Sequence, residues 1–227
     1  SILRHEEVEK RKKSSVISSA VGDKTTDRAT LVRLNQRLSA LYQLSEKLND
    51  LDDENENETL QAILDQAFQV LPADRAVFMT RYRPDSEELD VVAVKYRDEP
   101  IVPQKVQVSR TILDQVLNNQ ISVLSRDAMA DERFSSSESI IAAKVRSAIC
   151  TPMIVGKHVL GVLFVDTMRA ETPFTQDDLE FVTIIANETG VALSNMRMRK
   201  EAIHRQRLAA VGETVAGISH NVKNILL

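Results

Sequence analysis

The chain has 227 residues, of which 43% are hydrophobic, and this suffices to bury one core and leave helices outside it. Its net charge of -4 at pH 7 argues against a nucleic-acid partner, because neutralising phosphates requires a concentrated basic surface. The single cysteine, Cys150, excludes an internal disulfide and a Cys-x-x-Cys motif, which indicates a reducing cytoplasm. No apolar run is long enough to span a bilayer, and no signal-peptide core follows the basic N-terminus. We therefore expect a cytoplasmic protein without membrane contact.

The first 50 residues predict a linker followed by a helix. Residues 1–26 are charged and then small and polar, which is typical of a linker. Residues 27–50 follow a helical pattern in which leucines recur with spacings of three and four. These leucines are Leu31, Leu34, Leu38, Leu41 and Leu48. The spacing indicates an N-terminal coiled-coil helix, while a single amphipathic helix packed on its own domain would show a similar stripe.

A helix and a hairpin are predicted next, after an acidic loop. Residues 59–71 carry apolar side chains on one helical face, and Pro72 ends the helix. Residues 76–82 and 89–96 indicate two strands. The turn sequence Arg-Pro-Asp-Ser joins them, and its Pro and Asp favour type I geometry.

The middle of the chain alternates short strands and short helices. We expect a strand over 105–108, a helix over 110–117 capped by Ser109, a strand over 121–124, a polar loop over 125–136 and a helix over 138–143. The two helices would serve as crossovers between strands of one sheet.

Two apolar runs form the expected centre of the domain. Residues 147–155 and 159–166 are rich in Val, Ile and Leu and flank Gly156-Lys157-His158, in which glycine supplies the positive φ of a hairpin turn. Thr175 then caps a closing helix, with Asp178 three residues later as in a capping box. Together these elements predict an α+β domain: an antiparallel sheet with helices packed on one side, flanked by N- and C-terminal coiled-coil helices.

In combination, four segments resemble the GAF domain, a small-molecule-sensing and dimerising module related to PAS domains. They are VSRTILDQVL at 108–117, LSRDAMADERF at 124–134, VRSAICTPMIVGKHVLGVLFVD at 145–166 and FTQDDLEFVTIIANETGVALSNM at 174–196. The resemblance implies a GAF sensor domain over 51–196 with a PAS-like sheet. It looks most like the subgroup that follows a forkhead-associated domain, for which residues 1–22 would be the exit linker.

The resemblance also implies a ligand pocket. The loop and helix that line the pocket in GAF relatives correspond here to Asp127, Asp131, Arg133, Phe134, Ile140 and Arg146. A small-molecule ligand would lie there in a mostly apolar cavity with a few polar groups. The alternative is that these residues make surface salt bridges and packing contacts only.

Several specialised chemistries are disfavoured. The sequence Asp131-Glu132-Arg133-Phe134 only loosely matches the Asn-Lys-Phe-Asp/Glu constellation of cyclic-nucleotide GAF domains, because the Asn is missing. Bilin attachment in phytochrome-like domains uses a Cys in a helix-side loop, whereas Cys150 lies inside a strand and is followed by Thr151. A GAF-type methionine sulfoxide reductase would need several cysteines. The four histidines are scattered and none has metal-ligand spacing, so no metal site is expected.

The closing helix continues through residues 197–227 as an expected signalling helix and the start of a phosphoacceptor domain. Its apolar residues keep spacings of three and four, at Leu208, Val211, Val215, Ile218, Val222 and Ile225. This pattern predicts a coiled coil that pairs two copies of the chain in a parallel homodimer.

One histidine in this tail is a candidate phosphoacceptor. On the register that places Val215 and Val222 at a, His220 falls at f, the position facing water. The segment AAVGETVAGISHNVKNILL resembles the H-box of dimeric sensor histidine kinases, and His220 and Asn224 match its phosphorylated His and its Asn. The sequence departs from the family at Asn221, where such kinases often carry Glu or Asp, and an amide cannot act as a base. The alternative is an incidental exposed histidine on a coiled coil.

These observations favour the sensory and dimerisation module of a cytoplasmic histidine kinase in a two-component system. The H-box resemblance implies a response regulator as a second partner, and ATP with Mg²⁺ as cofactors of the full-length protein. No ATP-binding box is present, so we expect the chain alone to be inactive as a kinase and to hold no cofactor. Two alternatives stay open: a non-enzymatic GAF ligand-binding and dimerisation module, and a regulator whose GAF domain controls another output domain.

Overall fold

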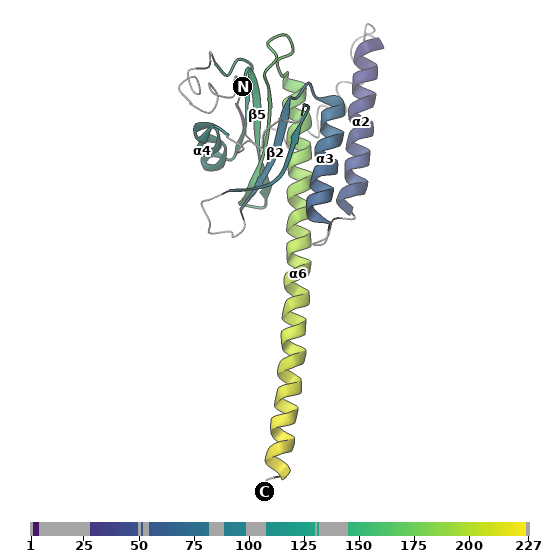
Figure 1. Cartoon of the computed structure of the whole chain (residues 1–227), viewed down its shortest axis with the longest axis vertical. Helices are drawn as coiled ribbons and strands as arrows, with labels where there is room; N and C mark the ends of the chain where they lie inside the picture. The colour runs from purple at the N-terminus through teal and green to yellow at the C-terminus, as the bar shows by residue number, and fades with distance from the viewer. Residues whose placement is uncertain are drawn as a thin grey trace.

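The computed structural model describes residues 2–4, 28–49, 51, 55–81, 89–98, 108–129, 131 and 145–225. Its centre is one antiparallel sheet with the strand order β1-β4-β5-β6-β2-β3 (Figure 1). The strands are β1 (Ile2–Arg4), β2 (Arg75–Thr80), β3 (Asp90–Tyr96), β4 (Ile121–Ser125), β5 (Ser147–Val155) and β6 (His158–Thr167). The helices are α2 (Arg28–Asn49), α3 (Glu56–Val70), α4 (Arg110–Asn119) and α6 (Gln176–Ile225). This arrangement confirms the predicted fold class.

The predicted central hairpin is confirmed and occupies the middle of the sheet. β5 and β6 pair from Ser147 opposite Thr167 to Val155 opposite His158. Gly156 in the turn has a φ of 61°, a conformation that side chains with a Cβ rarely adopt. All but the last residue of β5 are buried, because both faces of the hairpin are covered by helices.

The sheet grows outward from this hairpin on both sides. β2 pairs with β6 and with β3, so the predicted hairpin of β2 and β3 is also confirmed. β4 pairs with the other side of β5. Of the predicted strand over 105–108, only Val108 is described, and it belongs to no strand. The predicted helix over 138–143 lies outside the described residues.

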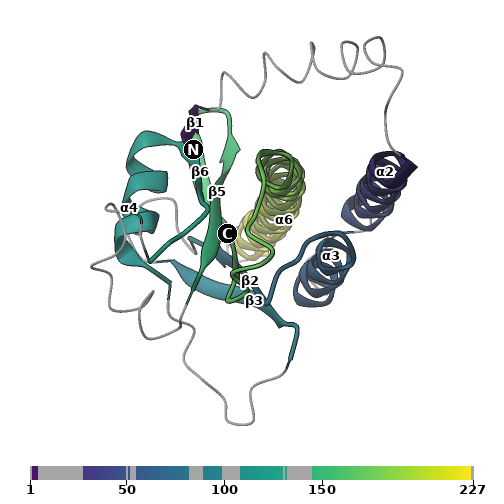
Figure 2. The ribbon, with the colours of Figure 1, turned by 90° about the horizontal axis from the view of Figure 1, so that it is seen from above.

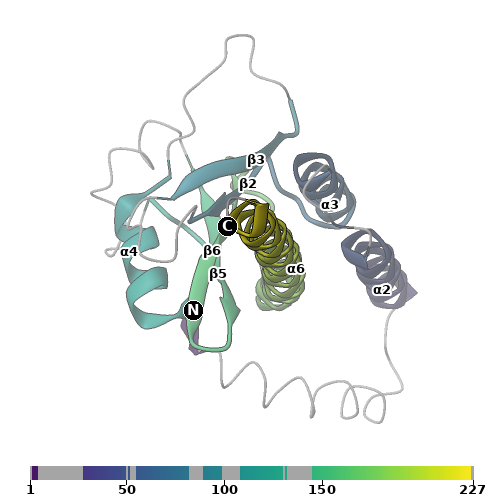
Figure 3. The same cartoon turned by 90° about the horizontal axis from the view of Figure 1, so that it is seen from below.

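The helices cover both faces of the sheet, whereas the sequence analysis placed them on one side. α2, α3 and α6 lie on one face, and α4 lies on the other (Figures 2 and 3). Two separate cores result. The larger core contains side chains of α2, α3 and α6, and the smaller contains side chains of α4. α4 reaches the second face because its two strongly buried residues, Ile112 and Val116, fall one helical turn apart and give it an apolar side of its own.

A sixth strand comes from the segment interpreted as a linker. Ile2–Arg4 pairs antiparallel with β4, with Ile2 opposite Val123. Without this pairing, β4 would be an edge strand with unpaired backbone groups, and a short extended segment suffices to pair them. The linker interpretation of residues 1–26 therefore overlooked this strand.

The leucine stripe of α2 divides into two parts. Leu41 and Leu48 pack against the larger core, together with the fully covered Leu44. Leu31, Leu34 and Leu38 are each more than half exposed in the single chain. The stripe therefore serves partly as an ordinary amphipathic face, and its first half is left for the predicted coiled coil.

The closing helix is much longer than the domain it covers. α6 has 50 residues and projects far beyond the sheet (Figure 1). Its predicted capping box is present: the Thr175 backbone N–H donates to the Asp178 carboxylate at 2.7 Å, and the Asp178 N–H donates to the Thr175 hydroxyl at 3.3 Å. Among the helices of the described residues, none has an apolar stretch that could cross a membrane.

Candidate functional site

The face of the sheet beneath α4 is the first candidate site. Its buried side chains form a compact apolar cluster that joins α4 to the strands. The cluster consists of Val77, Met79, Ile112, Val116, Ile121, Val123, Ala128, Val145, Ala148, Cys150, Val162 and Phe164. Burial raises the pKa of the Cys150 thiol far above its ordinary value, so the thiol stays protonated and packs as a small apolar group.

Two of the predicted pocket residues stabilise the loop after β4. The Ser125 hydroxyl donates to the Asp131 carboxylate at 2.9 Å, and the Asp131 backbone N–H donates to the Asp127 carbonyl at 2.9 Å. The Asp127 carboxylate accepts the Met129 backbone N–H at 3.2 Å, as in an Asx-turn. Both carboxylates therefore shape the loop at the end of β4.

A third predicted residue, Arg146, anchors the same loop through its backbone and leaves its side chain exposed. Its N–H donates to the Thr167 carbonyl at 2.8 Å, and its carbonyl accepts the Ala128 N–H at 2.7 Å. The structure thus brings Arg146 beside the loop of Asp127 and Asp131. Arg133, Phe134 and Ile140, the other predicted pocket residues, lie outside the described residues.

A buried ion pair on this face was missed by the sequence analysis. The Arg75 guanidinium donates to the Asp166 carboxylate through Nε, at 3.0 Å, and through Nη2, and its carbon lies 5.7 Å from the centre of the Phe164 ring. Asp166 is 1% exposed. A signal was present in the sequence, because a charged residue ends the apolar run of β6 and another begins the apolar run of β2.

This ion pair belongs to a row of side chains that crosses the sheet. Ser125 pairs with Ala148, Ala148 with Asp166, Asp166 with Arg75, and Arg75 with Tyr96. Directly paired residues share one face of a sheet, so the row lies on the face of α4. Burial raises the pKa of the Asp166 carboxyl, and the Arg75 guanidinium opposes that rise. The second carboxylate oxygen of Asp166 has no hydrogen-bond partner.

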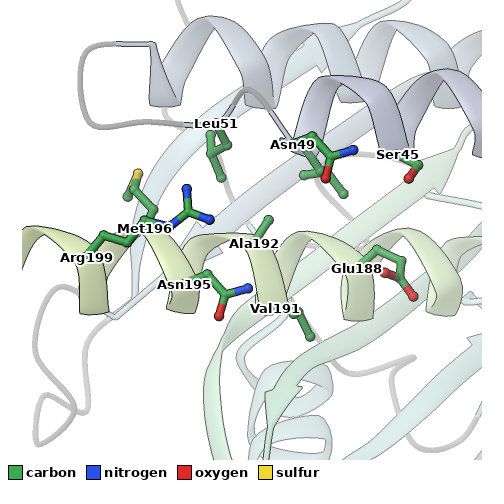
Figure 4. Close-up of a pocket in the computed structure, with 10 residues that line it drawn as sticks. Ser45, Asn49, Leu51, Glu188, Val191, Ala192, Asn195, Met196 and Arg199 are labelled. Atoms are coloured by element: carbon green, nitrogen blue, oxygen red, sulfur yellow. The ribbon is translucent and has the colours of Figure 1, made fainter.

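The second candidate site is a pocket of about 160 Å³ between α2 and α6 (Figure 4). It lies on the opposite side of the molecule from α4. Its lining residues are Ser45, Leu48, Asn49, Leu51, Glu188, Val191, Ala192, Asn195, Met196 and Arg199. Pockets for small-molecule ligands usually measure about 300–1,000 Å³, so this one has the size of a groove between two helices.

The third candidate site lies on the projecting part of α6. His220 and Asn224 fall within this helix, one turn apart along its backbone, and their side chains lie outside the described part of the structure. In the described residues, no three His, Cys, Asp or Glu side chains come together in a cluster that could hold a metal ion.

Comparisons with known proteins address the family directly. The sequence model of the GAF domain matches residues 55–193. No curated protein matches the chain.

Solved structures share the fold at low sequence identity. The GAF domain of a phosphoenolpyruvate-protein phosphotransferase from Coxiella burnetii aligns with a TM-score of 0.57 and 15% identity, over 73% of this chain and 97% of that chain. A phycocyanobilin-bound GAF domain from a cyanobacterial phytochrome aligns with a TM-score of 0.57 and 15% identity, over 72% and 96%. Free methionine-R-sulfoxide reductase from Neisseria meningitidis, in complex with its substrate, aligns with a TM-score of 0.57 and 17% identity, over 78% and 97%. These likenesses concern the fold, and the family follows from the sequence model: the chain belongs to the GAF domain family.

Proposed function

We propose that this chain is the sensory and dimerisation module of a signal-transduction histidine kinase. A GAF domain is a small-molecule sensing and regulatory module, and this provides the sensory half of the proposal. The observation that carries the rest is the single helix α6, which begins against the sheet at Gln176 and continues without a break to Ile225. A change at the sheet therefore has a rigid path to His220.

The ligand site of this proposal is the face beneath α4. Its floor is apolar, and the described polar groups gather at one end, where Asp131, Arg146 and the Arg75–Asp166 pair lie. An apolar cavity with a few fixed polar groups is the usual form of a small-molecule site. The ligand is a small molecule with an apolar body, and the loop after β4 reports its presence because it connects β4 to β5.

The partner of this proposal is a second copy of the chain in parallel orientation. Leu31, Leu34 and Leu38 on α2 are exposed at coiled-coil spacing, and the tail of α6 repeats that spacing. α2 and α6 run in the same direction, since Arg37 lies beside Asp178 near their beginnings and Leu48 beside Ala192 near the end of α2. A parallel pair would bring both stripes to their counterparts.

The output of this proposal is phosphorylation of His220. In the full-length protein, a domain beyond this chain would bind ATP and Mg²⁺, a forkhead-associated domain would precede residue 1, and a response regulator would accept the phosphate. Asn224 would orient the imidazole from one helical turn away. The ligand can bias this output only by as much as its affinity differs between two arrangements of the helices.

Phosphorylation tests the proposal in a protein extended past Leu227 through an ATP-binding domain. Labelled ATP should give an acid-labile, alkali-stable phosphate, as expected for a phosphoramidate on imidazole. His220→Ala should abolish the label, and His204→Ala should retain it, because His204 lies upstream of the matched motif. Persistent labelling of the His220→Ala protein would refute the assignment.

A second function is favoured by one residue. Asn221 replaces the acidic group that usually follows the phosphoacceptor, so the site can be inactive and the chain a ligand-binding and dimerisation module for another output. An ATP-competent extended protein without any label would support this alternative. Asn221→Glu would then be expected to restore labelling.

A further inference from the structure

An exposed apolar stripe lies on α6 within the domain. Val191 is 44% exposed and Met198 is 56% exposed. Met198 follows Val191 by seven residues, which leaves it about 20° short of two full helical turns, so both occupy one side of α6. Val191 lines the pocket between α2 and α6, and we call this pair of residues the domain stripe.

A second apolar stripe begins at Leu208, which is 59% exposed. In the sequence it continues at spacings of three and four to Ile225, and we call it the tail stripe. Leu208 follows Met198 by ten residues, one heptad plus three. On a straight helix, ten residues end about 80° short of three full turns. The tail stripe is therefore turned away from the domain stripe.

The segment between the stripes, residues 199–207, contains no side chain that connects them. It reads RKEAIHRQR, and the side chains of Glu201 and Arg205 form an exposed ion pair at 2.6 Å that supports the helix locally. Its one large apolar residue, Ile203, lies five residues from both Met198 and Leu208, about 140° from each on the helix. The helix continues through this segment while its apolar seam does not.

A regular two-stranded coiled coil needs the seam to repeat every seven residues. Three extra residues form a stammer, which overwinds the pair locally. Two helices that meet fully at the domain stripe are consequently out of alignment at the tail stripe.

We propose that the second copy of this chain is in full contact at only one of the two stripes at a time, and that residues 199–207 are the point where the pairing changes. This proposal rests on the proposed parallel dimer. In one state the copies meet at Val191 and Met198, and in the other they meet from Leu208 onward. Ligand binding in the domain then acts on the tail by favouring one alignment of α6 over the other.

Changing the number of residues between the stripes tests this proposal in the whole chain. Deletion of residues 202–204 leaves seven residues between Met198 and Leu208, and insertion of four helix-forming residues after Arg199 gives fourteen. Both variants align the stripes. Insertion of seven residues at the same place is the matched control, because it lengthens the helix by a whole heptad and keeps the misalignment.

The dissociation constant of the dimer, measured by sedimentation equilibrium, gives the answer. We expect both aligned variants to dimerise at least about tenfold more tightly than the wild type, and the control variant to match the wild type. Aligned variants that bind no more tightly than the control would overturn the switching proposal while the dimer stands. Monomers in every case would instead refute the dimer itself.

Discussion

The Arg37 guanidinium donates a hydrogen bond to the Asp178 carboxylate at 2.5 Å and so joins α2 to the first turn of α6. The same carboxylate accepts the backbone N–H and the hydroxyl of Thr175, each at 2.7 Å. Arg37 also lies over the Phe181 ring, at 5.9 Å from its centre. One carboxylate therefore caps the output helix and holds the outer helix in place.

Replacing Arg37→Met should loosen α2 without unfolding the domain. The variant loses a charge-assisted hydrogen bond from a guanidinium that is only 20% exposed, which costs about 1–2 kcal/mol of the free energy of unfolding. Arg33→Met on the exposed side of the same helix is the matched control and should change it by less than about 0.5 kcal/mol. Urea denaturation measures both, and equal effects would show that the Arg37 contact carries no stability.

The buried pair of Arg75 and Asp166 predicts a larger effect. Arg75→Met leaves the Asp166 carboxylate buried without a counter-charge, so we expect a loss of about 3–5 kcal/mol. The double variant Arg75→Met, Asp166→Leu removes both charges and should recover much of that loss. Thermal and urea unfolding of both variants measure the difference. A double variant less stable than Arg75→Met would show that the pair acts by more than mutual neutralisation.

The sequence predicted the centre of the fold because its signals are local. Two apolar runs around Gly156 dictate a hairpin, and Thr175 with Asp178 dictates a helix start. The face on which each helix lies is different in kind, because it depends on which strands flank it. That is why α4 was placed with the other helices although Ile112 and Val116 belong to the second core.

The candidate site was predicted less completely than the fold. Asp127, Asp131 and Arg146 do lie near one another, since a resemblance in sequence order transfers to adjacent loops. Arg75 and Asp166 are 91 residues apart, and only the pairing of β2 with β6 brings them together. Periodicity cannot reveal a partner at that separation.

The thiol of Cys150 should be unreactive in the folded protein. Burial raises its pKa, so the nucleophilic thiolate is suppressed near about pH 8 and the sulfur is also inaccessible. Iodoacetamide should label Cys150 only in denaturant, which mass spectrometry detects. Leu208→Cys, at an exposed position of α6, provides the control and should be labelled under native conditions. Labelling of Cys150 at the rate of this control would indicate an open α4 face.

Cyclic AMP and cyclic GMP should bind weakly or not at all. The loop after β4 lacks the Asn of the cyclic-nucleotide constellation, and the described carboxylates of Asp127 and Asp131 hold the loop. Titration calorimetry checks this expectation. A dissociation constant near about 1 μM that is lost in Arg146→Ala would contradict it, since the exposed Arg146 is then the phosphate contact.

Two threonines between α6 and the sheet should respond to the same substitution with opposite signs. Thr183 donates to the Leu179 carbonyl at 2.7 Å and lies 3.2 Å from the Ser122 hydroxyl, whereas the hydroxyl of Thr151, buried on β5, has no hydrogen-bond partner. Thr183→Val removes a formed hydrogen bond and should lower the free energy of unfolding by about 1 kcal/mol. Thr151→Val removes a hydroxyl that was desolvated without compensation and should raise it by about the same amount.

Both variants keep the shape of the side chain, so packing cancels in the comparison. Urea denaturation at one temperature, with equal m-values, gives the two differences directly. Destabilisation by Thr151→Val equal to that by Thr183→Val would mean that the Thr151 hydroxyl is hydrogen-bonded in solution, and α6 would then contact β5 through one more polar link than the structure shows.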